Sequence, residues 1–172
     1  MNVGLLVLHA FVGTLFAAHG SQKFLGWFGG FGIRGTGGYM ESIGLRNGAL
    51  LAAAAGSSEL VGGVLLAGGL LTPVAAGLLA TTMLVASRTD HRRKGLWIYQ
   101  GGSEYVLTNA VVVFALAFNG AGSWSLDAAI GWDVSGLWWG IGAVASALLG
   151  ATAVLGLFRR ESVAVGVAPS AG

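Results

Sequence analysis

The chain has 172 residues, of which 55% are hydrophobic and only 9% are charged, and its formal net charge is +2. A soluble domain carries roughly 25% charged residues, so this chain has too few charges to cover a water-facing surface and predicts an integral membrane protein. The absence of cysteine excludes disulfides, cysteine-ligated iron–sulfur clusters and thioether-attached haem, and the scattered basic residues argue against a nucleic-acid partner.

Apolar segments predict an all-α bundle of five membrane-spanning helices, forming one domain over residues 1–158. The apolar run from Ala49 to Ser87 would be ~58 Å long as a single helix, nearly twice the ~30 Å hydrocarbon thickness. It must therefore fold back, and Thr72-Pro73 is the natural turn. The five expected spans are residues 2–20, 49–71, 73–89, 104–118 and 136–158.

The segment between the first two spans, residues 21–48, is rich in glycine and aromatic residues. We predict an amphipathic loop at the cytoplasmic membrane surface, with Gly38–Leu45 as one short helix. Two interpretations stay open for this loop. It is either an anchor on the membrane surface, which its composition favours, or a lid over a site.

Basic residues indicate the orientation of the bundle. All nine lysines and arginines lie within residues 21–48, 87–95 and 159–172, which are alternate exposed segments of a five-span chain. The positive-inside rule then places the N-terminus outside and the C-terminus in the cytoplasm. We therefore expect a multi-pass protein of the cytoplasmic membrane, ending in a short disordered tail over residues 159–172.

Glu59 is the one ionisable residue between Ala49 and Ser87. It lies ~15 Å into the second span, near the bilayer midplane, where a charge costs ~2.5–3.5 kcal/mol. His9 and Asn109 on other spans are candidate partners in a polar cluster. Glu59 is either a neutral acid that hydrogen-bonds between helices, or a proton-carrying or ligand-binding group inside a membrane pocket.

A second polar cluster is expected at the cytoplasmic face. Histidine, lysine, carboxylate and phenol groups together could hold a quinone headgroup and exchange protons with it. The alternative is ordinary snorkelling of polar side chains at helix ends. The cluster comprises His19, Lys23, Asp90, His91, Glu104 and Tyr105.

Other site types find little support in the sequence. His9 and His19 are ~15 Å apart along one helix, so they cannot ligate one metal ion together. No nucleotide-binding fingerprint is present, because no strand precedes the glycines of GWFGGFGIRG. Gly142, Ser146 and Gly150 form a stripe of small residues on the last span. That stripe predicts close packing within the chain or, as the alternative, a homo-oligomer.

Five stretches in consistent order resemble the DoxX family of bacterial membrane proteins, over about residues 10–131. They are HGSQKFLGWFGGFGIRGTGGYMESIGL, ELVGGVLLAGGLLTPVAA, MLVASRTDHRRKGLW, GGSEYVLTNA and NGAGSWSLDAAIG. The resemblance implies a helical bundle, commonly of four spans, to which the last span here would be an addition. The family takes its name from a subunit associated with thiosulfate:quinone oxidoreductase, and some members are linked to a complex that handles oxidative and thiol stress.

The resemblance also implies that certain motif residues are the functional candidates. They are His19, Lys23, Glu59, His91, Glu104 and Tyr105. This chain departs from the family pattern at Asp90, where a small apolar residue is more usual, and at Ala121, where a GPG motif is common.

The leading hypothesis is a membrane subunit of a quinone-linked oxidoreductase with a protonatable pocket. No redox cofactor site is visible, so a soluble partner enzyme at the cytoplasmic face or a bound quinone must carry the electrons. The alternatives are a non-enzymatic scaffold that docks soluble partners through its basic loop, and a small proton-linked transporter.

Overall fold

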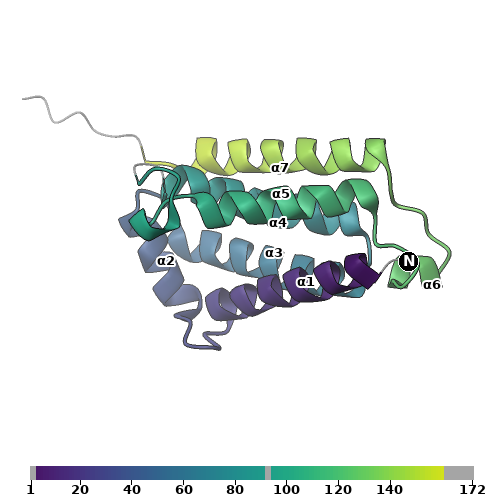
Figure 1. The fold of residues 1–172 in the computed structure, drawn as a ribbon. Helices are drawn as coiled ribbons and strands as arrows, with labels where there is room; N and C mark the ends of the chain where they lie inside the picture. Colours follow the sequence, from purple (N-terminus) through teal and green to yellow (C-terminus); the bar gives the residue numbers. More distant parts are fainter. Residues whose placement is uncertain (1–2, 92–93, 161–172) are drawn as a thin grey trace, which may run out of the picture.

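The computed structural model describes residues 3–91 and 94–160 of the chain (Figure 1). Within these residues the protein is all-helical, and helices lie at the positions of all five expected spans. The predicted disorder of the tail concerns mainly residues 161–172, which lie outside the described residues. The elements are α1 (Val3–Phe24), α2 (Gly32–Ser42), α3 (Gly48–Gly68), α4 (Thr72–Thr89), a 3-10 turn η1 (Ile98–Gln100), α5 (Glu104–Asn119), α6 (Leu126–Ala129) and α7 (Leu137–Phe158).

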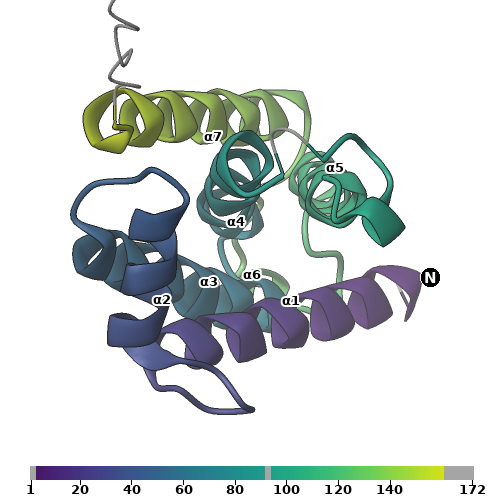
Figure 2. The same ribbon diagram turned by 90° about the vertical axis from the view of Figure 1, so that its left-hand side faces the viewer.

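The helices form two groups. α1, α2 and α3 pack on one another, α4, α5 and α7 pack on one another, and the two groups meet mainly through α3 and α4. Figure 2 shows α7, α4 and α5 above and α1, α2 and α3 below. The described loops that carry basic residues lie at the end of the bundle where α2 is, whereas α6 and the N-terminus lie at the opposite end (Figure 1).

Glycines bring α1 and α3 into backbone contact. A Cβ atom added to Gly13 would lie 2.6 Å from the carbonyl oxygen of Gly63, and one added to Gly20 would lie 2.7 Å from that of Gly56. Only residues without a side chain permit so close an approach. The contact runs to the end of α1, because a Cβ on Gly56 would meet the Lys23 Cβ at 3.3 Å. The sequence predicted the end of this helix at Gly20, and its extension to Phe24 carries Lys23 alongside the middle of α3.

The turn between α3 and α4 comprises residues 69–71, directly before the Thr72-Pro73 pair at which the sequence predicted it, and Thr72 and Pro73 begin α4. Gly69 and Leu71 have φ values of 61° and 49°, in the left-handed region. The carboxylate of Asp127 accepts hydrogen bonds from the Leu71 backbone N–H at 3.1 and 3.0 Å, which stabilises this strained residue. Asp127 is buried at the start of α6. Its hydrogen bonds therefore hold the loop after α5 against the turn between α3 and α4.

The helix expected at Gly38–Leu45 begins six residues earlier, at Gly32, and ends at Ser42. Glycine disfavours helix in isolation, but tertiary packing overrides that preference. A Cβ on Gly48 would lie 2.0 Å from the Gly37 carbonyl oxygen, so glycine in this stretch lets α2 pack directly on the start of α3. α2 lies across the end of the bundle rather than along it (Figure 1).

Two of the three small residues in the stripe on α7 pack against another helix of the same chain. A Cβ on Gly77 would lie 2.5 Å from Ser146 Oγ, and a Cβ on Gly150 would lie 3.0 Å from Thr81 Oγ1, so both stripe residues face α4. A Cβ on Gly142 would meet nothing within 4 Å.

The helices and their surroundings indicate a membrane protein. In the described part of the chain α1, α3 and α7 are each long and apolar enough to cross a bilayer, and α5 is a shorter apolar helix. Several exposed aromatic side chains lie in the loops, among them Trp27 and Phe31 before α2 and Trp132 before α7. Such rings are typical of the two membrane–water interfaces.

Candidate functional site

A cavity of about 400 Å³ lies between the two groups of helices. Side chains from α1, α2, α3, α4, α5 and α7 line it, and most of them are apolar. Its ionisable and phenolic lining residues come from both groups, and they are His19, Lys23, Tyr39, Glu59, Asp90, His91 and Tyr105.

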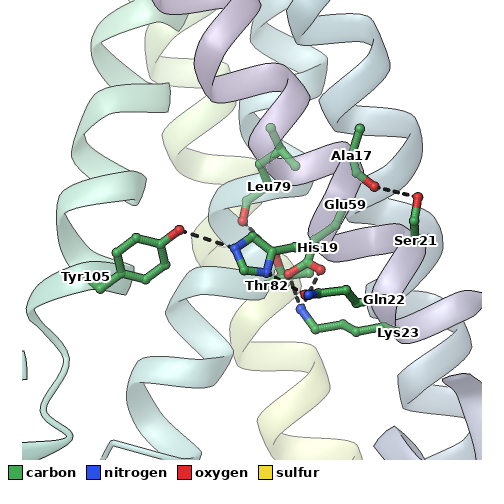
Figure 3. Close-up of polar contacts among 9 residues, drawn as sticks. All are labelled: Ala17, His19, Ser21, Gln22, Lys23, Glu59, Leu79, Thr82 and Tyr105. Carbon is green, nitrogen blue, oxygen red and sulfur yellow. Dashed lines mark hydrogen bonds and ion pairs between the residues drawn. The ribbon is translucent and has the colours of Figure 1, made fainter. Parts of the chain in front are cut away.

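Glu59 and Lys23 form an ion pair in the wall of this cavity (Figure 3). The Lys23 ammonium donates to both carboxylate oxygens of Glu59. Glu59 is fully buried at 0% exposure, whereas the Lys23 side chain remains 29% exposed. A buried carboxylate needs such a partner because an uncompensated charge is very costly in a low-dielectric interior.

The structure pairs Glu59 with Lys23 rather than with the two partners that the sequence suggested. His9 is buried, and its Nδ1–H donates to the Leu66 carbonyl oxygen at 2.9 Å. Asn109 donates from Nδ2 to the Tyr105 carbonyl oxygen of its own helix at 3.0 Å. Neither residue lines the cavity, so the expected cluster of Glu59, His9 and Asn109 does not form.

His19 and Tyr105 join the two groups of helices at the cavity wall. The Gln22 side-chain NH₂ donates to the Phe28 carbonyl oxygen, which turns its Oε1 toward His19 Nδ1 at 3.1 Å. Nδ1 therefore carries the proton, and Nε2 accepts from the Tyr105 hydroxyl at 3.3 Å (Figure 3). The rings meet edge to face, with centroids 6.3 Å apart.

Tyr39 was not singled out from the sequence, although it too lines the cavity. Its hydroxyl donates to Asp90 at 2.6 Å, and Lys94 donates to the same carboxylate oxygen at 3.0 Å. Burial, the hydrogen bond to Asp90 and the charge of Asp90 together raise the pKa of Tyr39 to about 12. The available signal was the position of Tyr39 in a segment expected to be amphipathic, because a phenol on such a helix can contact the groups that the helix covers.

Asp90 is therefore the partner of Tyr39. Burial by itself raises the pKa of Asp90, but the hydrogen bonds from Tyr39 and Lys94 outweigh it and hold this pKa below its ordinary value. α2 also contributes Met40 to the cavity lining, as does Ile43 directly after it, while Phe31 directly before it is 81% exposed. The segment thus has one face on the cavity and one face outward.

The last two candidates have different places. His91 lines the cavity, and its Nδ1–H donates to the Gly101 carbonyl oxygen at 2.6 Å. Glu104 does not line the cavity, and its Oε2 accepts from the Ile98 backbone N–H at 2.9 Å, which holds the η1 turn. Glu104 is therefore a loop-stabilising residue in this structure.

The arrangement is suited to a small ligand that needs hydrogen bonds and proton exchange in an apolar setting. Pockets for such ligands are mostly apolar, with a few placed polar groups. Within residues 3–91 and 94–160, no three histidine, aspartate or glutamate side chains converge as metal ligands.

Comparison with known proteins gives a family match for the first half of the chain. A family model described as DoxX matches residues 4–92, which include α1 to α4, the Lys23–Glu59 pair and Asp90. No curated protein and no solved structure matches the chain.

Proposed function

Because this chain belongs to the DoxX family, we propose that it is a membrane subunit of a quinone-linked oxidoreductase and that its central cavity holds the quinone ring. The observation that carries the proposal is the buried Glu59–Lys23 pair in the wall of an apolar cavity of about 400 Å³. That volume falls within the ~300–1,000 Å³ range of small-molecule sites, and ionisable residues at membrane depth are functional candidates by default.

The cavity residues have defined roles in this proposal. A quinone takes up two electrons and two protons when it is reduced to a quinol. The chain contains no cysteine, so it holds no thiolate redox centre, and a soluble redox enzyme at the cytoplasmic face supplies the electrons. The Lys23–Glu59 pair and the Tyr105–His19 pair hold protons at the cavity wall. Tyr39, bonded to Asp90, closes the cavity on the side of α2.

The proposal includes five crossings of the cytoplasmic membrane by α1, α3, α4, α5 and α7, with the N-terminus outside. The gathering of basic loops at the α2 end of the bundle supports this orientation (Figure 1). α2 then lies in the cytoplasmic interface, where a soluble partner can reach it.

A blocked cavity tests the quinone site. Ser58 lines the cavity, whereas the adjacent Ser57 is exposed and does not line it. Ser58→Phe is expected to abolish binding of menadione, a neutral naphthoquinone, to the purified protein, and Ser57→Phe is the matched control that should bind like the wild type. Calorimetry in detergent or lipid nanodiscs measures both. Absent binding to the wild type, or unchanged binding to Ser58→Phe, overturns the proposal.

A scaffold that docks soluble proteins is the second candidate, and one observation favours it. Leu96, Trp97, Ile98 and Tyr99 are consecutive exposed apolar or aromatic residues beside the basic loop. Arg92 and Arg93 of that loop lie outside the described residues. If the scaffold role is correct, neutralising Arg92, Arg93 and Lys94 abolishes co-purification of partners while Ser58→Phe does not.

A further inference from the structure

Among the residues that the structure describes, the cavity lining carries only three formally charged side chains, apart from its histidines. Lys23 is the one lysine or arginine among the described lining residues, and Glu59 and Asp90 are the acidic ones. With histidines neutral, the lining therefore carries one net negative charge. Asp90 is bonded to Lys94, which lies outside the lining.

The Lys23 charge is compensated inside the protein. Its ammonium contacts both Glu59 oxygens, and Glu59 is fully buried, so the carboxylate cannot turn away into water. An anionic ligand would have to give up its hydration beside this carboxylate without meeting a free cation, and like charges placed together without solvent are strongly unfavourable.

A neutral carbonyl compound meets no such obstacle. A lysine ammonium has three N–H donors, and Glu59 occupies two of them, which leaves one for a carbonyl oxygen. The Lys23 side chain is 29% exposed and lines the cavity, so this donor is accessible to a ligand there.

The geometry points to Glu59 as the residue that makes this cavity select neutral carbonyl-bearing rings over organic anions of the same shape. This inference rests on the proposed quinone site and deepens it. Glu59 acts on specificity by cancelling the charge of Lys23. This role does not depend on the shape of the cavity, which the Ser58→Phe variant tests.

Two naphthoquinones of nearly the same shape test the inference. Menadione is neutral, and lawsone, which carries a hydroxyl in place of the methyl group, is an anion at neutral pH. The wild type is expected to bind menadione at least about tenfold more tightly than lawsone. Glu59→Gln, which leaves Lys23 unpaired, should raise the affinity for lawsone at least about tenfold and change that for menadione only a few-fold.

The double variant Lys23→Gln/Glu59→Gln removes the freed cation and should lose the gain in lawsone affinity. Asp133→Asn makes the same charge change in an exposed loop at the opposite end of the bundle and should bind like the wild type.

Equal wild-type affinities for the two compounds overturn the inference alone, and this measurement needs no variant. The inference is also overturned if Glu59→Gln does not raise the affinity for lawsone, or if the double variant keeps the raised affinity. If the wild type binds neither compound, the proposed quinone site fails first, and this selectivity fails with it.

Discussion

Lys23 and Glu59 lie on different helices and are 36 positions apart, so no local sequence pattern indicates that they pair. Glu59 was recognisable from the sequence as a carboxylate that needs shelter. Its partner was not, because the sequence assigned Lys23 to the separate polar cluster at the cytoplasmic face and suggested His9 and Asn109 as partners. The pairing depends on how far α1 extends along α3, which only the glycine contacts between the two helices define.

Breaking this pair from its two sides should have unequal effects. Lys23→Met leaves the fully buried Glu59 without a partner and is expected to destabilise the protein by ~3–5 kcal/mol. Glu59→Gln should cost less, because the freed lysine is partly exposed to the cavity. Denaturant unfolding in detergent measures both changes. A larger loss for Glu59→Gln would contradict the burial asymmetry of the pair.

Tyr39 should show its hydrogen bond in an alkaline titration. Its pKa is raised to about 12, so the folded state keeps this proton at pH values where an unfolded tyrosine, with a pKa near 10, has lost it. Its contribution to stability is fully present below pH ~10 and is lost as the pH rises toward 12. Phenolate absorbance should contain a component near pH 12.

Two variants control that titration. Tyr39→Phe should remove the component near pH 12, and Tyr99→Phe, which removes an exposed tyrosine, should leave it in place. If the component survives in Tyr39→Phe, the Tyr39–Asp90 contact does not hold the phenol proton.

Among the elements, α1 and α3 share the most extensive helix contact, and that contact places Lys23 beside Glu59. The hydropathy of both helices was evident from the sequence, because apolar runs are local features. The start of α2 was not, because glycine-rich residues 32–38 have low intrinsic helix preference and become helical only against α3.

The α1–α3 contact makes Gly13 intolerant of even one methyl group. Its Cβ would lie 2.3 Å from the Ala67 backbone nitrogen, which cannot move independently of the helix. Gly13→Ala should therefore destabilise the protein by ~1–3 kcal/mol through overpacking. Gly142→Ala on α7 is the matched control, since its Cβ would meet nothing within 4 Å, and its melting temperature should be unchanged or slightly higher. Equal melting temperatures for wild type and Gly13→Ala would refute the close contact.

In the whole molecule, two groups of three helices enclose the cavity between them, and their loops gather at two opposite ends (Figures 1 and 2). The boundary between the two groups is formed mainly by α3 and α4. His19–Tyr105 and Tyr39–Asp90 are side-chain contacts across that boundary.

The five-span topology predicts opposite exposure of two loop residues. The chain has no cysteine, so single cysteines can be introduced without background. Asp133→Cys should react with an impermeant maleimide on intact cells, and Tyr99→Cys, at a position 79% exposed, should react only after permeabilisation. Labelling of both from the same side would exclude an odd number of crossings between them and hence the proposed topology.

The sequence by itself determined the membrane class, the positions of the long helices and the family resemblance, because hydropathy, basic loops and motifs are all read from neighbouring residues. Only the tertiary structure decided that Glu59 pairs with Lys23, that Tyr39 joins the cavity, and that His9, Asn109 and Glu104 do not. Those outcomes depend on the relative position of helices along their axes. That position is decided by glycine-sized contacts between distant segments, which have no local pattern in the chain.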